Sequence, residues 1–255
     1  MNNILPPKYL YKYKSLLSNY DLEKIKSIIS DHKIYMPTYT QLNDPAEGGI
    51  IDISVPGYAG CGNYICADEE DPYIKSNKER YRILSLTDNP ISSIMWAHYA
   101  AQYKGACLCY STLGSFSNVE PVIYRNAREK YDIDYEALNS VIKSSFYYKQ
   151  EDWGYEHEWR ILSDSDDLFF KYEPKELVGI IIGYATKECL KNELVDFIRE
   201  KENLLIVLRA EPGYRTLKVN IMEYDYQYIY GSGYKKTIND LTCYFDCQKG
   251  TTKDR

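Results

Sequence analysis

ELVGIIIGYATKECLKNELVDFIREK, residues 176 to 201, is the stretch that most strongly constrains the fold. Residues 176 to 183 (ELVGIIIG) carry a continuous apolar run, which predicts a buried strand. Residues 187 to 201 place apolar side chains at helical spacing, which predicts a strongly amphipathic helix. LLIVLRA (204 to 210) and TLKVNIMEYDY (216 to 226) then read as strands.

Working outward from this stretch, the rest of the chain also alternates between strand and helix patterns. Strands are predicted at 8 to 13, 33 to 39 (broken by Pro37), 80 to 87, 105 to 110, 119 to 124 and 156 to 163. Helices are predicted after the caps Ser18 and Asn19, at 92 to 105 and at 134 to 149, whereas residues 50 to 79 look irregular. Because strands outnumber helices and helices fall irregularly between them, the expected class is α+β. We expect one domain over residues 1 to 231 and a polar C-terminal tail over 232 to 255.

Composition narrows the function classes. A chain of 255 residues with a formal net charge of -6 has no general basic surface, which disfavours free nucleic acid as a partner. There is no run of eighteen apolar residues and no signal-peptide layout at the start, so no membrane association is expected. Seven Cys, an odd number without a CxxC pair, indicate a reducing compartment, and we expect a cytoplasmic protein without structural zinc.

WGYEHEWR, residues 153 to 160, interleaves charged side chains with aromatic rings. If residues 156 to 163 form a strand, alternation places Glu156, Glu158 and Arg160 on one face. One interpretation is an edge strand whose charged face is solvated. The other places this row in a cleft walled by Tyr and Trp, where Arg160 keeps one carboxylate ionised. Neighbouring carboxylates repel, so their pKa values should separate, which suits acid-base work or stabilisation of a developing cation.

The segment IMWAHYAAQYKG (94 to 105) is the next candidate. On a helix, Trp96 and Tyr99 lie on one stripe, and aromatic residues at that spacing are more typical of a core than of a cofactor site. His98 falls outside the stripe and could equally be solvated. Gly-rich phosphate loops offer no alternative, because neither GCG (60 to 62) nor GSG (231 to 233) completes a GxGxxG or P-loop pattern.

The turn LNDPAEGG, residues 42 to 49, has two interpretations. Asn43 or Asp44 ahead of Pro45 is a standard turn initiator, and either residue could instead contact a ligand. Asp44 and Glu47 could also bind a metal, but two oxygens in a turn are too few to identify one. No metal site is therefore predicted.

The motifs taken together resemble a known family. LYKY (10 to 13), LNDPAE (42 to 47), ILSLTD (83 to 88), MWAHYAAQYKGACL (95 to 108) and WGYEHEWRIL (153 to 162) are similar, in order, to signatures of the bacterial family named domain of unknown function 2971. The resemblance spans roughly residues 8 to 183 and is loose beyond. Two departures are Ala46, where the family usually has Phe, and the strand residues Leu84, Ser85 and Leu86, where it has Cys-Phe-Ser.

The layout of this family is similar, more remotely, to ADP-ribosyltransferase-like folds. The resemblance implies a mixed, mainly antiparallel split sheet with flanking helices, and NAD as the substrate. Cleavage of the nicotinamide N-glycosidic bond builds an oxocarbenium-like cation that a carboxylate can stabilise. By this resemblance Glu158 is the first choice for that role and Glu156 the second, while Arg160 orients the carboxylate or contacts a phosphate.

The resemblance also implies binding roles for residues outside this segment. Tyr11 and Lys12 would contact ribose or phosphate, and Ser85 would position the nicotinamide ribose. Tyr99, with Trp96 behind it, would stack on the base, and His98 belongs to the same motif.

Three functional classes stay open at this point. The first is an NAD-consuming transferase or glycohydrolase, a toxin or anti-phage effector with a protein or nucleic-acid acceptor. The second is a metal-dependent nuclease or hydrolase that uses Asp44, Glu47, Glu156 and Glu158. The third is a non-catalytic module whose Tyr-lined groove binds a nucleotide or a protein.

Overall fold

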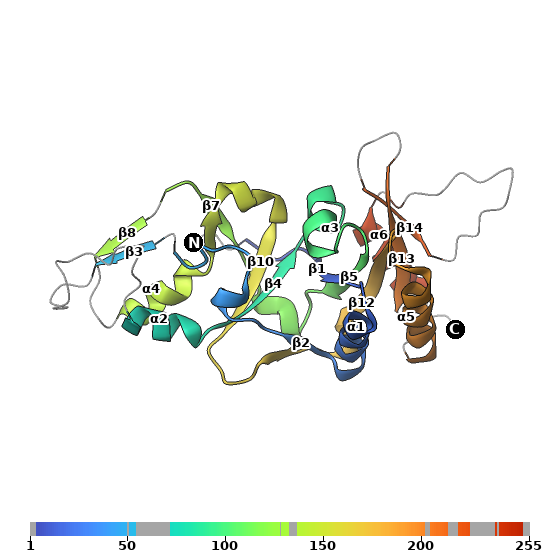
Figure 1. The fold of residues 1–255 in the computed structure, drawn as a ribbon, viewed down its shortest axis with the longest axis horizontal. Coiled ribbons are helices and arrows are strands. Elements are labelled where there is room, and N and C mark those ends of the chain that lie inside the picture. Colours follow the sequence, from blue (N-terminus) through green and yellow to red (C-terminus); the bar gives the residue numbers. More distant parts are fainter. Residues whose placement is uncertain are drawn as a thin grey trace, which may run out of the picture. The chain divides into compact units, whose positions relative to one another are not determined.

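The computed structural model describes residues 4–49, 51–54, 72–127, 129–132, 137–201, 205–213, 219–224, 238 and 240–251. The chain divides into two compact units, each assembled from three segments. Unit 1 comprises Met1–Pro6, Ile34–Leu86 and Asn118–Phe170, and unit 2 comprises Pro7–Lys33, Thr87–Ser117 and Lys171–Arg255. Figure 1 labels their helices and strands. The domain limits proposed from the sequence stay a prediction.

Unit 2 contains a five-stranded part of the sheet. Its strands follow the order β14 (Val219–Glu223), β13 (Ile206–Pro212), β12 (Leu177–Gly183), β5 (Gly105–Ser111) and β1 (Tyr9–Ser15). Every residue of β12 is buried, which confirms the strand predicted from its apolar run. β12 and β13 are parallel and are connected through α5 (Glu188–Lys201), whereas the other neighbours in this part pair antiparallel.

Two helices of unit 2 follow directly from the sequence pattern. α1 (Asn19–Asp31) begins at the Ser18 cap, whose side chain accepts a hydrogen bond from the Asp21 backbone N–H. Its buried residues have the spacing of one helix face: Leu22, Ile25, Ile28 and Ile29. α1 lies beside α5 (Figure 1). α6 (Leu241–Thr251) docks through Phe245, whose ring centroid lies 5.2 Å from that of Tyr9.

The helix predicted over 92 to 105 is shorter than expected. α3 (Ser93–Tyr99) is followed by three non-glycine residues in the left-handed region, Ala101, Gln102 and Tyr103. A left-handed backbone cannot continue a right-handed helix, so the sequence prediction was wrong beyond Tyr99. The tight turn packs against Gly183, where an added Cβ would lie 2.2 Å from the Tyr103 carbonyl oxygen.

Unit 1 contains three neighbouring strands of the sheet, in the order β4 (Arg82–Thr87), β10 (Glu158–Ser163) and β6 (Glu120–Pro121). Thr87, the last residue of β4, already belongs to unit 2. Three strand pairs are also seen among its described residues: β2 (Lys33–Tyr35) with β11 (Phe169–Lys171), β3 (Ile51–Ser54) with β8 (Glu129–Asp132), and β7 (Ile123–Arg125) with β9 (Tyr148–Gln150). In the first pair, Lys33 and Lys171 already belong to unit 2. The two helices α2 (Pro72–Glu79) and α4 (Leu138–Ser145) lie beside each other (Figure 1).

The core of unit 1 joins these helices to the strands. It consists of Ile74, Tyr81, Ile83, Leu138, Ile142, Phe146 and Tyr148. Apolar side chains removed from water in this way contribute roughly 1.5–3 kcal/mol each. β9 starts in this core at Tyr148, and Leu162 near the end of β10 packs against it, so both strands are held in place by packing.

Several boundaries in unit 1 differ from the sequence prediction. The strand at 33 to 39 ends at Tyr35, before Pro37. The segment 119 to 124 divides into β6, which pairs with β10, and β7, which pairs with β9. The helix predicted over 134 to 149 covers only α4, and its last residues form β9. Residues 50 to 79, read as irregular, include β3 and α2, while 55 to 71 and both Gly-rich sites lie outside the described residues.

The fold class is nevertheless the expected one. The protein is α+β, with a large, mostly antiparallel sheet and flanking helices. In the part of the chain that the structure describes, no helix has both the length and the apolar composition needed to cross a bilayer.

Candidate functional site

The charged row of residues 156 to 160 is buried inside unit 1. Glu156 is 4%, Glu158 5% and Arg160 0% exposed. The interpretation as a solvated edge strand is therefore wrong. Three charged side chains shielded from water must be paired, because an isolated buried charge is very costly.

The backbone of residues 151 to 158 differs from the predicted strand. This difference explains how the side chains of Glu156 and Glu158 reach the same buried cluster. Residues Glu151–Glu156 form a 3₁₀ helix, η4, and His157 is left-handed with φ 47°. β10 therefore starts at Glu158, two residues later than predicted. Glu158 and Arg160 still share a face by alternation, whereas Glu156 approaches from the end of η4.

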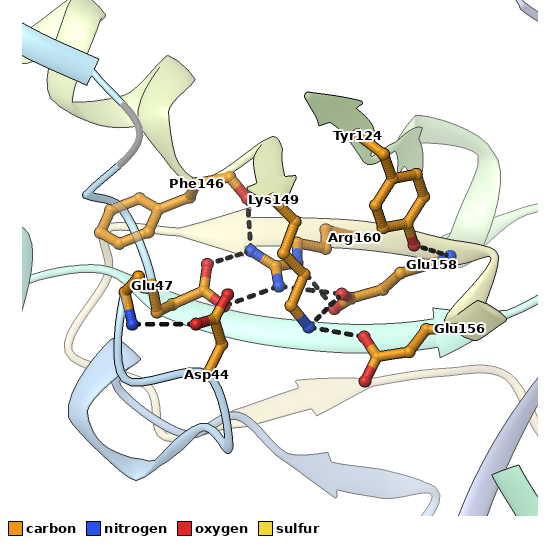
Figure 2. Close-up of polar contacts among 9 residues, drawn as sticks. Asp44, Glu47, Tyr124, Phe146, Lys149, Glu156, Glu158 and Arg160 are labelled. Atoms are coloured by element: carbon orange, nitrogen blue, oxygen red, sulfur yellow. Dashed lines mark hydrogen bonds and ion pairs between the residues drawn. The ribbon is translucent and has the colours of Figure 1, made fainter. Parts of the chain in front are cut away.

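Lys149 on β9 joins the two acids. Its Nζ donates to Glu156 Oε2 at 2.5 Å and to Glu158 Oε2 at 3.2 Å, as Figure 2 shows. The same Nζ lies 4.7 Å from the ring centroid of Trp153, a cation–π distance. One buried ammonium group thus fixes both carboxylates.

Arg160 closes the network on its other side. Its Nε donates to Glu158 Oε1 at 2.7 Å and its Nη2 to Glu158 Oε2 at 2.9 Å. Both terminal nitrogens also donate to the carboxylate of Glu47, and Nη1 donates to the carbonyl of Phe146. The planar guanidinium therefore bridges two carboxylates, each held by two hydrogen bonds (Figure 2).

A sixth ionisable side chain, Asp44, is buried beside Glu47 in the same turn and is 3% exposed (Figure 2). Its Oδ1 accepts a hydrogen bond from the Ala46 backbone N–H at 2.9 Å. Its Oδ2 is buried and has no hydrogen-bond partner among the described residues. With Glu47, Glu156 and Glu158 it makes four carboxylates against the two cations Lys149 and Arg160, a formal charge of -2 for these six groups.

The two carboxylates bound by Arg160 differ in their proton affinity. Burial opposes ionisation of Glu158, but the charges of Arg160 and Lys149 outweigh it and hold the pKa of Glu158 well below its ordinary value. Burial raises the pKa of Glu47 more than the charge and hydrogen bonds of Arg160 lower it, and the charge of Glu158 adds repulsion. Glu158 is thus ionised at neutral pH and cannot act there as a proton acceptor.

Lowering the pH should change the contributions of Glu158 and Glu47 to the stability of unit 1 in opposite directions. The depressed folded-state pKa of Glu158 stabilises unit 1 at neutral pH, and this contribution is lost as the pH falls below about 4.3. The raised folded-state pKa of Glu47 stabilises it below about 4.3, and this contribution is lost as the pH rises through the folded-state pKa. Chemical unfolding between about pH 4 and pH 8 tests this, because the wild type should lose stability as Glu47 ionises. The Glu47→Gln variant should not show this decrease in the free energy of unfolding. Parallel profiles of variant and wild type would contradict the raised pKa.

Two further side chains affect Glu158. The hydroxyl of Tyr124 on β7 accepts a hydrogen bond from the Glu158 backbone N–H at 2.8 Å, and Tyr124 is the strand partner of Lys149. Ser85 lies on β4, the strand beside β10, and its side chain helps to lower the pKa of Glu158. The structure thus brings together four predicted site residues, Ser85, Glu156, Glu158 and Arg160.

The remaining predicted site residues lie partly in unit 1 and partly in unit 2. In unit 1, Asn43 is exposed. In unit 2, Tyr11 is buried and Lys12 half-buried on β1, and on α3 Tyr99 is half-buried and His98 exposed. Trp96 is fully buried; its indole N–H donates to the Pro90 carbonyl and its ring stacks on Tyr103 at 5.6 Å. The core interpretation of Trp96 is confirmed, and its side chain has no surface left to offer a ligand.

Sequence reasoning missed Lys149 and underrated Glu47. Lys149 was assigned to the end of a helix, where a lysine is ordinary, and Glu47 appeared only as one of two oxygens in a turn. Tyr147 and Tyr148 just before Lys149 are β-prone residues that signalled a strand at this point. Among the described residues, no group of three or more His, Cys, Asp or Glu side chains has an arrangement suited to a metal ion.

Comparisons of the chain with protein-family models, with curated proteins and with solved structures found no significant match. The resemblance carried by the five motifs therefore stays a prediction.

Proposed function

We propose that this protein is an NAD-consuming enzyme, an ADP-ribosyltransferase or NAD glycohydrolase, whose reaction is centred on Glu158. The observation that carries this proposal is the buried carboxylate of Glu158, kept ionised and oriented by Arg160 and Lys149. A fixed charge of this kind needs no reorganisation when a substrate develops positive charge, and such preorganisation is the largest contribution in many enzymes.

The protonation state of Glu158 selects one role over another. A general base should have a pKa near the working pH, whereas the pKa of Glu158 is depressed. Stabilisation of a cation requires the opposite, a carboxylate that stays ionised. In the proposed step the bond between the ribose C1′ and the nicotinamide nitrogen breaks, and its electron pair leaves with neutral nicotinamide. A ribosyl cation remains, which water or an acceptor nucleophile attacks with release of a proton.

The charge of the cluster also favours a cationic substrate group. Counted formally, the four carboxylates exceed the two cations Arg160 and Lys149 by two, or by one when Glu47 is protonated as its raised pKa favours, so the excess charge is negative in either case. The nicotinamide ring of NAD carries a positive charge in the ground state, and the ribosyl cation inherits it in the transition state. Electrostatic interactions in a shielded site are stronger than in water.

The resemblance to the family named domain of unknown function 2971 supports the same proposal. We therefore also propose that the protein belongs to this family and has an ADP-ribosyltransferase-like fold. We further propose that it is cytoplasmic and acts as a toxin or anti-phage effector. Tyr11, Lys12 and Tyr99 belong to unit 2, and their roles in binding NAD stay expectations of the resemblance alone. The acceptor is a protein, a nucleic acid or water.

A metal-dependent nuclease is less well supported. The oxygens of Glu47 and Glu158 that a divalent cation would need are already bound by Arg160 and Lys149. A metal ion would have to bond to these oxygens directly and so displace both buried cationic side chains, whereas the charge of Glu158 acts on a ribosyl cation through space. In a non-catalytic module the buried network would only stabilise unit 1, and NAD would not be cleaved.

The test is incubation of the purified protein with NAD, with nicotinamide release and transfer of ADP-ribose to protein, DNA or RNA as readouts. We expect nicotinamide release. We also expect tighter binding of NAD than of NADH, because the two differ in the positive charge of the nicotinamide ring. Equal affinity for both would remove the electrostatic argument, and absence of turnover with every acceptor would overturn the proposed function.

A further inference from the structure

The exposed face of α6 carries two cysteines one helical turn apart, Cys243 and Cys247. The opposite face is anchored in unit 2: Leu241 and Phe245 are buried. Asp246 accepts hydrogen bonds from Lys8 and from the Tyr9 hydroxyl, both at 2.6 Å. Because the helix is held on one side, the two thiols are presented to solvent on a fixed backbone.

The two thiols are close enough to act together. Cys243 and Cys247 lie four residues apart on α6, and both side chains are exposed. Residues four apart on a helix have Cβ atoms about 5–6 Å apart. A disulfide needs Cβ atoms roughly 3.5–4.5 Å apart, so it would distort α6. Joint binding of one ion by the two sulfurs requires no such distortion.

We propose that Cys243 and Cys247 form a two-thiolate site for a thiophilic monovalent metal ion, Cu(I). Thiolates are the soft ligands that select Cu(I), and two of them satisfy this ion. Zn²⁺ instead takes four ligands in structural sites, and two thiols supply half of that set. On binding, both thiols lose their protons, two sulfur–copper bonds form and two protons are released, without any change of oxidation state. This site is independent of the Glu158 cluster.

The test uses the full chain in which Cys61 and Cys66, which lie outside the described residues, are replaced by Ser. Cu(I) is titrated under anaerobic conditions against a chromophoric Cu(I) chelator, and the retained Cu(I) is measured. We expect one equivalent of Cu(I) per chain. The Cys243→Ser and Cys247→Ser variants should each lower Cu(I) retention at least tenfold, because a single thiolate does not chelate.

Cys189→Ser is the matched control, because Cys189 is also exposed on a helix but has no second cysteine one turn away. It should retain Cu(I) like the parent chain. Circular dichroism checks that α6 stays helical in each variant. Full retention in either the Cys243→Ser or the Cys247→Ser variant, or failure of the parent chain to hold Cu(I) against the chelator, would overturn the proposal.

Discussion

Replacing Arg160 by Met is expected to lower the free energy of unfolding by about 3–5 kcal/mol, the usual cost of removing one partner from a buried ion pair. Arg160 is fully buried and binds Glu47, Glu158 and the Phe146 carbonyl. Methionine fills much of the volume but leaves the buried Glu47 carboxylate without Arg160 and Glu158 with Lys149 as its remaining cation. Denaturant unfolding, followed by fluorescence, gives the change in midpoint.

The control for this prediction is Arg80→Met, which removes an exposed arginine of the same unit and should change stability by less than about 0.5 kcal/mol. A triple variant with Arg160→Met, Glu47→Gln and Glu158→Gln should recover much of the loss, because it no longer buries those unpaired charges. If Arg160→Met unfolds at the wild-type midpoint, the network does not hold unit 1 together.

Replacing Glu158 by Gln is expected to lower the rate of NAD cleavage about 10²- to 10³-fold, the loss typical when one preorganised electrostatic group is removed. Glutamine keeps the size of the side chain and removes its charge. The ribosyl cation then loses its nearest fixed negative charge, whereas contacts with the rest of NAD persist. The rate constant for nicotinamide release should therefore fall more than the affinity for NAD.

Two comparisons separate a catalytic from a structural effect of Glu158→Gln. Glu79→Gln neutralises an exposed acid at the end of α2 and should leave the rate unchanged. Glu156→Gln removes the carboxylate that contacts Lys149 from the other side and should reduce the rate less than Glu158→Gln. The thermal midpoint of each variant shows whether it is folded. A folded Glu158→Gln protein with undiminished nicotinamide release would refute the assignment of Glu158.

Much of the fold could be predicted because its elements depend on local patterns. The apolar run of β12, the Ser18 cap of α1 and the spacing of Leu22, Ile25 and Ile28 each specify an element within a few residues of chain. The predictions failed where tertiary contacts override a local pattern. Trp96 to Tyr103 reads as one helix, yet the chain turns left-handed at Ala101.

The sequence by itself determined the α+β class, most strands and the identity of the row Glu156, Glu158 and Arg160, because composition and periodicity are properties of neighbouring residues. It left open whether that row faced water. Only the tertiary structure decided this, by bringing Glu47 and Lys149 from distant segments to Arg160 and Glu158. The physical reason is that a charged side chain can be buried only beside an oppositely charged partner. Here the partners come from distant segments of the chain, which a local sequence pattern does not specify.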